Sequence, residues 1–212
     1  MPALAQLARR CGLGAALLGV LALGACQRSF IPATIETNYP ADDVAKELEF
    51  WHTLPARSAV CNDEGLHGLI LLADNQDTTG SYTARLALAK QRGWVSHDFN
   101  EPGNLAMQRG TLARAVCVIC KIQGGLMMTV FGPIPRYATR ELVYMRLMGD
   151  PSTENLAITG LEYMGVISKA QDYMMLQAVP PAPAAPSTPD APPPAAPAAP
   201  AEPAEAPANP PQ

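Results

Sequence analysis

The sequence predicts a mostly α-helical domain of three helix–loop–helix repeats, with one short β segment and a disordered Pro/Ala-rich tail. Apolar residues recur at helical spacing in six segments between residues 42 and 173. A short sequence pattern returns at an offset of 51 residues. Residues 180–212 hold fourteen Pro and twelve Ala, a composition that cannot build a packed core. The middle of the chain is therefore expected to fold as one domain.

The six predicted helices are separated by Gly, Pro and polar loops. They cover residues 42–51, 62–73, 82–92, 109–121, 137–148 and 159–173. Between the fourth and the fifth, Leu126–Phe131 is rich in β-prone residues and is flanked by glycines, which predicts a short strand. The predicted organisation is a leader (1–25), a tether (26–41), a helical domain (42–177) and a tail (178–212).

The N-terminus carries an export pattern. Arg9-Arg10 precede an apolar run that is too short to span a membrane and has the length typical of a signal peptide. The run ends in Leu23-Gly24-Ala25-Cys26, which resembles the lipobox of bacterial lipoprotein precursors. The resemblance implies cleavage before Cys26, lipidation of Cys26 with acyl chains such as palmitate, and attachment to the cell envelope. An ordinary cleaved signal peptide followed by a chance cysteine is the alternative.

The residue after the lipobox cysteine helps to predict which membrane holds the lipoprotein. Gln27 stands where an Asp would retain many envelope lipoproteins at the inner membrane. By resemblance to those lipoproteins, the protein is expected at the outer membrane, facing the periplasm.

The internal repeat groups the helices into pairs. Asn104-Leu105-Ala106-Met107 matches Asn155-Leu156-Ala157-Ile158. A weaker match, Val60-Cys61-Asn62-Asp63-Glu64, lies 47 residues before Met107, so that Val60 corresponds to Met107. A helix follows each match and another precedes it. One such unit cannot bury its apolar face alone, so three are expected to pack together.

This layout resembles the S-layer homology (SLH) family, which has three such repeats and an Ile-Thr-Arg-Ala-Glu motif opening each second helix. Here residues 158–162 keep Ile, Thr and Glu but lack the Arg, and the middle repeat keeps only Arg109 and a following small residue. Residues 122–136 have no place in the family pattern. The resemblance implies noncovalent binding of peptidoglycan or another cell-wall glycan, with Arg109, Thr159 and Glu162 as the contacting residues. Thr159-Gly160-Leu161-Glu162 also fits a capping box, in which Thr159 caps the last helix and Glu162 reaches back to the Thr159 amide.

Cys117 and Cys120 form a Cys-x-x-Cys pair inside the fourth predicted helix. Buried thiols are favoured, because an i,i+3 disulfide within a helix is strained. A disulfide to Cys61 and a metal or haem site are the alternatives. No second cysteine pair or nearby His completes a metal site, so no cofactor is expected.

The net charge of −4 and the lack of a basic run argue against nucleic acid as a partner. No catalytic motif is present, which predicts a protein that is not an enzyme. The leading hypothesis is an envelope lipoprotein with a structural or attachment role between membrane and cell wall. The alternatives are a protein-interaction subunit of an envelope assembly, and a redox or haem protein that uses Cys117 and Cys120.

Overall fold

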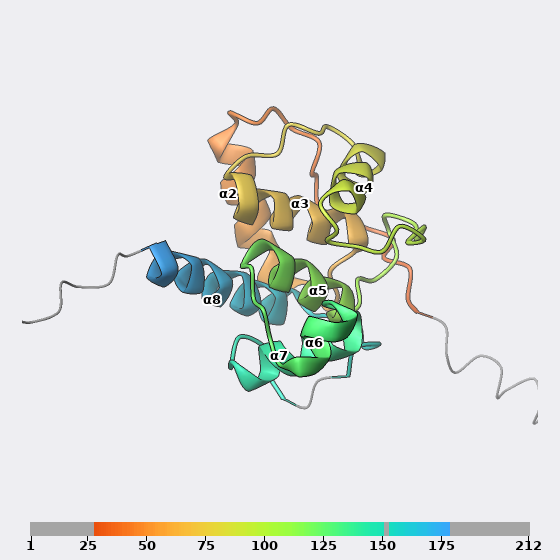
Figure 1. Cartoon of the computed structure of the whole chain (residues 1–212). Helices are drawn as coiled ribbons and strands as arrows, with labels where there is room; N and C mark the ends of the chain where they lie inside the picture. The colour runs from red at the N-terminus through yellow and green to blue at the C-terminus, as the bar shows by residue number, and fades with distance from the viewer. Residues whose placement is uncertain (1–27, 151–152, 179–212) are drawn as a thin grey trace, which may run out of the picture. The chain divides into compact units, whose positions relative to one another are not determined.

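A computed structural model describes residues 28–150 and 153–178 (Figure 1). The predicted signal peptide, Cys26 and the Pro/Ala-rich tail from residue 179 on lie outside the described residues. Within them the chain forms seven α-helices, a 3-10 turn (η1) and no strand. The helices are α2 (Val44–Thr53), α3 (Asn62–Asp74), α4 (Tyr82–Gln91), α5 (Arg109–Ile119), α6 (Leu126–Phe131), α7 (Pro135–Tyr144) and α8 (Gly160–Ala178), and η1 is Leu54–Ala56.

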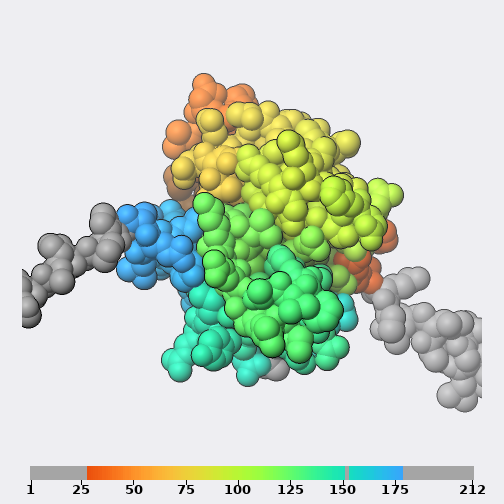
Figure 2. All heavy atoms as spheres, viewed as in Figure 1, coloured from red at the N-terminus to blue at the C-terminus, as the bar shows by residue number. Residues whose placement is uncertain are grey.

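The prediction of a mostly helical domain is confirmed, but the predicted strand at 126–131 is wrong. This segment is α6, a short helix on the molecular face that Figure 2 presents. Its backbone groups bond locally, with the Met128 and Thr129 amides donating to the carbonyl of Gly125 at 2.9 and 3.1 Å. In the described region no strand lies beside it, and a lone strand would leave its amides and carbonyls unpaired. A helix satisfies them within the segment.

Three backbone hydrogen bonds form a closed ring at the centre of the domain. The Val60 amide donates to the Ile158 carbonyl (2.9 Å), the Ile158 amide to the Met107 carbonyl (3.0 Å), and the Met107 amide to the Val60 carbonyl (2.8 Å). All three residues are fully buried. Each lies immediately before the N-cap of α3, α5 or α8. The three helices therefore start from one centre, and Figure 1 shows α4 on one side of this group and α6 and α7 on the other.

Small residues let the central helices approach their neighbours closely. A Cβ at Gly160, the first residue of α8, would lie 1.7 Å from the carbonyl oxygen of Leu54 in η1. On α3, Gly65 accepts a hydrogen bond of 2.7 Å from the buried hydroxyl of Tyr163 on α8. A side chain at Gly160 would force α8 away from η1, so packing requires glycine at that position.

Candidate functional site

The predicted tether lies against the domain rather than hanging from it. The Arg28 guanidinium pairs with Glu101, with one contact of 2.8 Å between Nη1 and Oε2. The Ile31 amide then donates to the Asn104 carbonyl at 2.8 Å. The chain is thus bonded to the domain from its first described residue, which is only two positions after Cys26.

Farther along, the same segment is tied to the first turns of α3. Thr37 Oγ1 donates to Asp63 Oδ2 at 2.9 Å. Tyr39 Oη lies 2.6 Å from His67 Nε2. Both partners belong to the helix that begins at the central ring, so the segment and the core of the domain share one hydrogen-bond network.

Arg85, on α4, is the centre of this network. Its side chain is only 1% exposed. Its Nε donates to Asp77 at 2.5 Å, its Nη1 donates to Asp63 at 2.7 Å, and its Nη2 donates to the carbonyl of Thr37 at 2.6 Å. One buried cation therefore holds two carboxylates and the backbone of the N-terminal segment. We call this set the buried clamp: Thr37, Tyr39, Asp63, His67, Asp77 and Arg85.

The charges in the buried clamp are set by its hydrogen bonds. Burial alone would raise the pKa of Asp77, but hydrogen bonds from His67, Thr79 and Arg85 outweigh it and hold this pKa well below its usual range. Burial, reinforced by nearby carboxylates such as that of Glu47, raises the pKa of Tyr39 well above its usual range. Asp77 therefore stays ionised and Tyr39 keeps its proton near neutral pH.

Tyr39, His67 and Asp77 are joined by hydrogen bonds in the order found in an acid–base relay. A substrate, however, cannot reach them. His67 Nδ1 lies 2.6 Å from Asp77 Oδ2, and Nε2 is occupied by Tyr39. The His67 ring is buried, and it also packs edge-on against Phe50. A general acid or base must come within hydrogen-bond reach of a substrate, and neither ring nitrogen has room for one. The geometry fits a device that fixes the N-terminal segment in place.

The structure brings together the three residues predicted to contact glycan, but it pairs them with one another. Arg109, at the start of α5, forms an ion pair with Glu162 in the first turn of α8, with Nε and Oε2 at 3.2 Å. Both side chains are largely buried. Thr159 is exposed, and its hydroxyl accepts a hydrogen bond of 3.3 Å from the Glu162 amide. This contact caps α8, as expected from the sequence, while the ion pair links two helices that start at the central ring.

The cysteines within the described part of the chain are free and buried. Cys117 Sγ faces the Ala138 carbonyl on α7 at 4.0 Å, whereas Cys120 Sγ faces the Ala170 carbonyl on α8 at 3.9 Å. Burial raises the pKa of Cys117 to about 12 and that of Cys120 to about 11. Two protonated thiols that point at different helices do not form a reactive pair.

Cys61 is separate from this pair. It is the N-cap residue of α3, and burial raises its pKa to about 12. Within residues 28–150 and 153–178, no three His, Cys, Asp or Glu side chains gather as a metal site would require.

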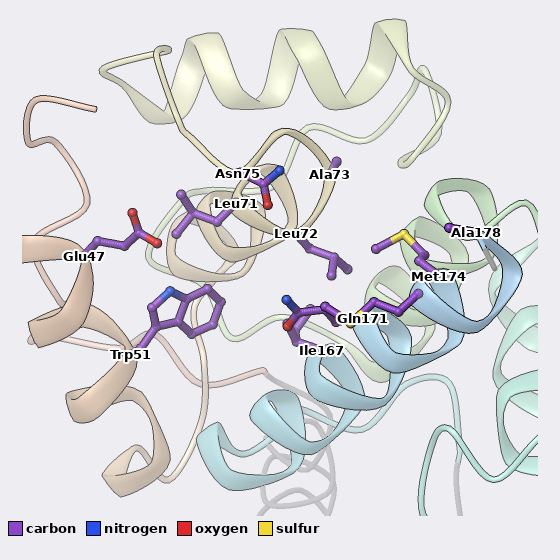
Figure 3. Close-up of a pocket in the computed structure, with 11 residues that line it drawn as sticks. Glu47, Trp51, Leu71, Leu72, Ala73, Asn75, Ile167, Gln171, Met174 and Ala178 are labelled. Atoms are coloured by element: carbon purple, nitrogen blue, oxygen red, sulfur yellow. The ribbon is translucent and has the colours of Figure 1, made fainter. Parts of the chain in front are cut away.

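An open groove of about 520 Å³ lies between α2, α3 and α8 (Figure 3). Trp51 enters from α2, Leu72 from α3, and Met174 from α8. Polar and apolar atoms line the groove in about equal measure, and Glu47, Asn75 and Gln171 supply polar groups. Such a mixed lining suits the side chains of a partner protein.

The buried clamp was not predicted from the sequence, although one residue pointed to it. His67 lies in the most apolar run of the domain, and a buried imidazole needs polar partners. Its partners come from positions 39 and 77, in two different loops. Their approach depends on how the segments fold back on α3, which no local pattern encodes.

No family model, curated protein or solved structure matched the chain. None of the helices in the described ranges combines the length and the apolar character needed to cross a bilayer. The chain's own residues and their geometry therefore carry the functional argument.

Proposed function

We propose that this protein is a non-enzymatic, lipid-anchored component of the bacterial cell envelope with a structural or attachment role. Cys26 carries the acyl chains, and the helical domain is held directly at the membrane surface, facing the periplasm. The observation that carries the proposal is the lipobox Leu23-Gly24-Ala25-Cys26, followed within two residues by a segment bonded to the domain. An anchor so close to a fixed segment would limit both the reach and the orientation of the domain.

The domain is proposed to consist of three SLH-like helix–loop–helix units. The ring formed by Val60, Met107 and Ile158 supports this, because these are the positions that the sequence repeat makes equivalent. The Arg109–Glu162 ion pair would then join two units.

Two measurements test this proposal. Cells fed an alkyne-labelled palmitate should label the wild-type chain and not the Cys26→Ser variant, and the variant should move from the membrane to the soluble fraction. The mature chain with Cys26→Ser should also co-sediment with purified peptidoglycan sacculi at low salt. An unlabelled wild-type chain would refute the anchor, and a chain left wholly in the supernatant would refute direct attachment to the wall.

The role of Arg109 in wall binding can be separated from general charge. If it contacts glycan, Arg109→Gln should release the chain from sacculi. Arg140→Gln, which removes an exposed cation on α7, should leave binding unchanged. Equal effects of the two substitutions would assign any binding to charge alone.

A second candidate is a protein-interaction subunit of an envelope assembly, which the groove between α2, α3 and α8 favours. Met175 lines the groove and is exposed. Met175→Asp should release a partner that is cross-linked to the wild-type protein in membranes, whereas Leu48→Asp, an exposed change on α2 outside the groove, should retain it. Retention by both variants would remove the groove from consideration.

A further inference from the structure

The short helix α6 presents bulky apolar side chains to solvent. Leu126, Met127, Val130 and Phe131 are 75%, 52%, 64% and 60% exposed. Only Met128 of this helix is buried in the core. Contiguous exposed apolar side chains of this size mark a surface that contacts something other than water. We call these four exposed residues the α6 patch.

The segment that contains the α6 patch is richer in cations than the protein as a whole. Residues 102–140 contain no Asp or Glu and five Lys or Arg, while the full chain has a net charge of −4. One carboxylate lies at the edge of the patch, because Glu141 accepts a hydrogen bond of 3.3 Å from the Gly125 amide just before α6. Three of these cations, Lys121, Arg136 and Arg140, are exposed and form no ion pair among the described residues. The sequence shows no basic run because these cations are dispersed. The absence of Asp and Glu between residues 102 and 140 is what distinguishes this segment. An apolar strip with basic residues beside it is typical of elements that lie in a lipid interface.

The α6 patch belongs to the end of the domain that would carry the anchor. Pro135, which opens α7 just after α6, packs against Gly110 in the first turn of α5, since a Cβ at Gly110 would lie 2.8 Å from the Cβ of Pro135. The start of the described chain meets the same end of α5, because the Ala106 amide donates to the Ser29 carbonyl at 3.1 Å. Near this start, Phe30 is also exposed.

The proposed anchor leaves little distance to the bilayer. An extended chain spans about 3.5 Å per residue, so Cys26 lies within about 7 Å of Arg28 along the chain. Because Arg28 is paired with Glu101 on the domain, acyl chains on Cys26 would place this end of the domain against the headgroups. Figure 2 shows the region of α6 (green) on the face toward the viewer, beside the region of α7, with no described segment lying over it.

We propose that the α6 patch docks on an anionic bilayer surface, as a second membrane contact beside the lipid anchor. The apolar side chains enter the boundary between headgroups and acyl chains, and Lys121, Arg136 and Arg140 meet lipid phosphates. The part of this proposal that concerns location rests on the proposed anchor at Cys26. Two contacts would fix the orientation of the domain, which one anchor leaves free to rotate.

The test uses the full mature chain with Cys26→Ser, so that no acyl chain contributes. Its binding is measured by co-sedimentation with vesicles of phosphatidylethanolamine and phosphatidylglycerol, and with vesicles of phosphatidylcholine alone. Binding is expected to the anionic vesicles, to be weaker on phosphatidylcholine, and to weaken with salt. The double substitution Val130→Asp and Phe131→Asp should weaken binding by at least about tenfold.

A matched control is available on α2. Val44 and Leu48 are 75% and 56% exposed, so Val44→Asp with Leu48→Asp adds the same charge to an apolar surface outside the α6 patch. This control should bind vesicles as the parent does, and circular dichroism should show both doubly substituted chains folded. Because the substituted side chains, Val44, Leu48, Val130 and Phe131, are all exposed, neither pair of substitutions disturbs the core.

Three results would overturn the proposal: no binding to anionic vesicles, equal losses in the two doubly substituted chains, or full vesicle binding by the α6 variant together with loss of a protein partner. The last would make the α6 patch a protein-docking surface. Palmitate labelling of the wild-type chain tests the lipid anchor independently of vesicle binding. A chain without label but with α6-dependent vesicle binding would refute the anchor and keep the second contact.

Discussion

Removing the cation of the buried clamp should destabilise the whole domain. Arg85→Met keeps most of the side-chain volume and removes the charge. Asp77 is then left ionised in the interior without its guanidinium partner, and the Thr37 carbonyl loses a donor. Breaking a buried pair by removing one partner costs about 3–5 kcal/mol, because the remaining charge stays desolvated.

A matched substitution lies at the end of the same helix. Arg92 follows α4 and pairs with Asp74 at 2.8 Å, with both side chains 35% exposed. Its guanidinium also lies 5.1 Å from the ring centre of Trp94. A solvent-screened pair contributes about 0–1 kcal/mol and an exposed cation–π contact about 0.5–1 kcal/mol. Arg92→Met should therefore cost less than about 2 kcal/mol.

Urea and thermal unfolding, followed by circular dichroism, measure the difference. For a chain of this size, 1 kcal/mol corresponds to about 2–4 °C in Tm, so Arg85→Met should lower Tm by about 6–20 °C and Arg92→Met by only a few degrees. Similar small losses in both variants would refute the reasoning. They would mean that water reaches the buried clamp in solution and screens its charges.

Three further outcomes are expected. Gly160→Ala should destabilise the domain by more than about 3 kcal/mol, because its Cβ would overlap the Leu54 carbonyl. Gly165→Ala, in open space on α8, should stabilise the domain by about 0.5–1 kcal/mol, and urea unfolding midpoints measure both changes. In the Cys26→Ser mature chain at about pH 8, a thiol reagent should label no cysteine until urea is added, because burial raises the thiol pKa values; rapid labelling of the folded chain would contradict this. The pKa of Asp77 in the folded protein lies below the ordinary 3.8, so ionised Asp77 stabilises the fold above that pH, and this stabilisation is lost as the pH falls through the folded pKa. Asp77→Asn should therefore lower the free energy of unfolding at neutral pH and reduce its dependence on pH in acid. An unchanged pH dependence in acid would refute the role of Asp77.

Helix positions could be predicted well where apolar periodicity and caps coincide. Thr159 was predicted to cap the last helix, and its hydroxyl does accept the Glu162 amide. The prediction of a strand at residues 126–131 was wrong because β propensity describes how a side chain fits on a sheet. It carries no information on whether a partner strand exists. There was none in the described region, and local hydrogen bonds decided for the helix.

The candidate site divides in the same way. Arg109, Thr159 and Glu162 could be found from a motif, yet the motif did not reveal that Arg109 and Glu162 bind each other. Arg85 belongs to no motif, and it is the centre of a buried network only through its contacts with positions 37, 63 and 77.

The sequence by itself determined the helical class, because helical periodicity depends on residues close together in the chain, and it carries the patterns that predict the repeat and the lipobox. Only the tertiary structure decided that the segment after Cys26 is bonded to the domain, that His67 and Arg85 share a buried network, and that α6 exposes its apolar side chains. These features join residues far apart in sequence. Their energies come from burial and from hydrogen bonds made in the packed domain, which the order of residues does not display.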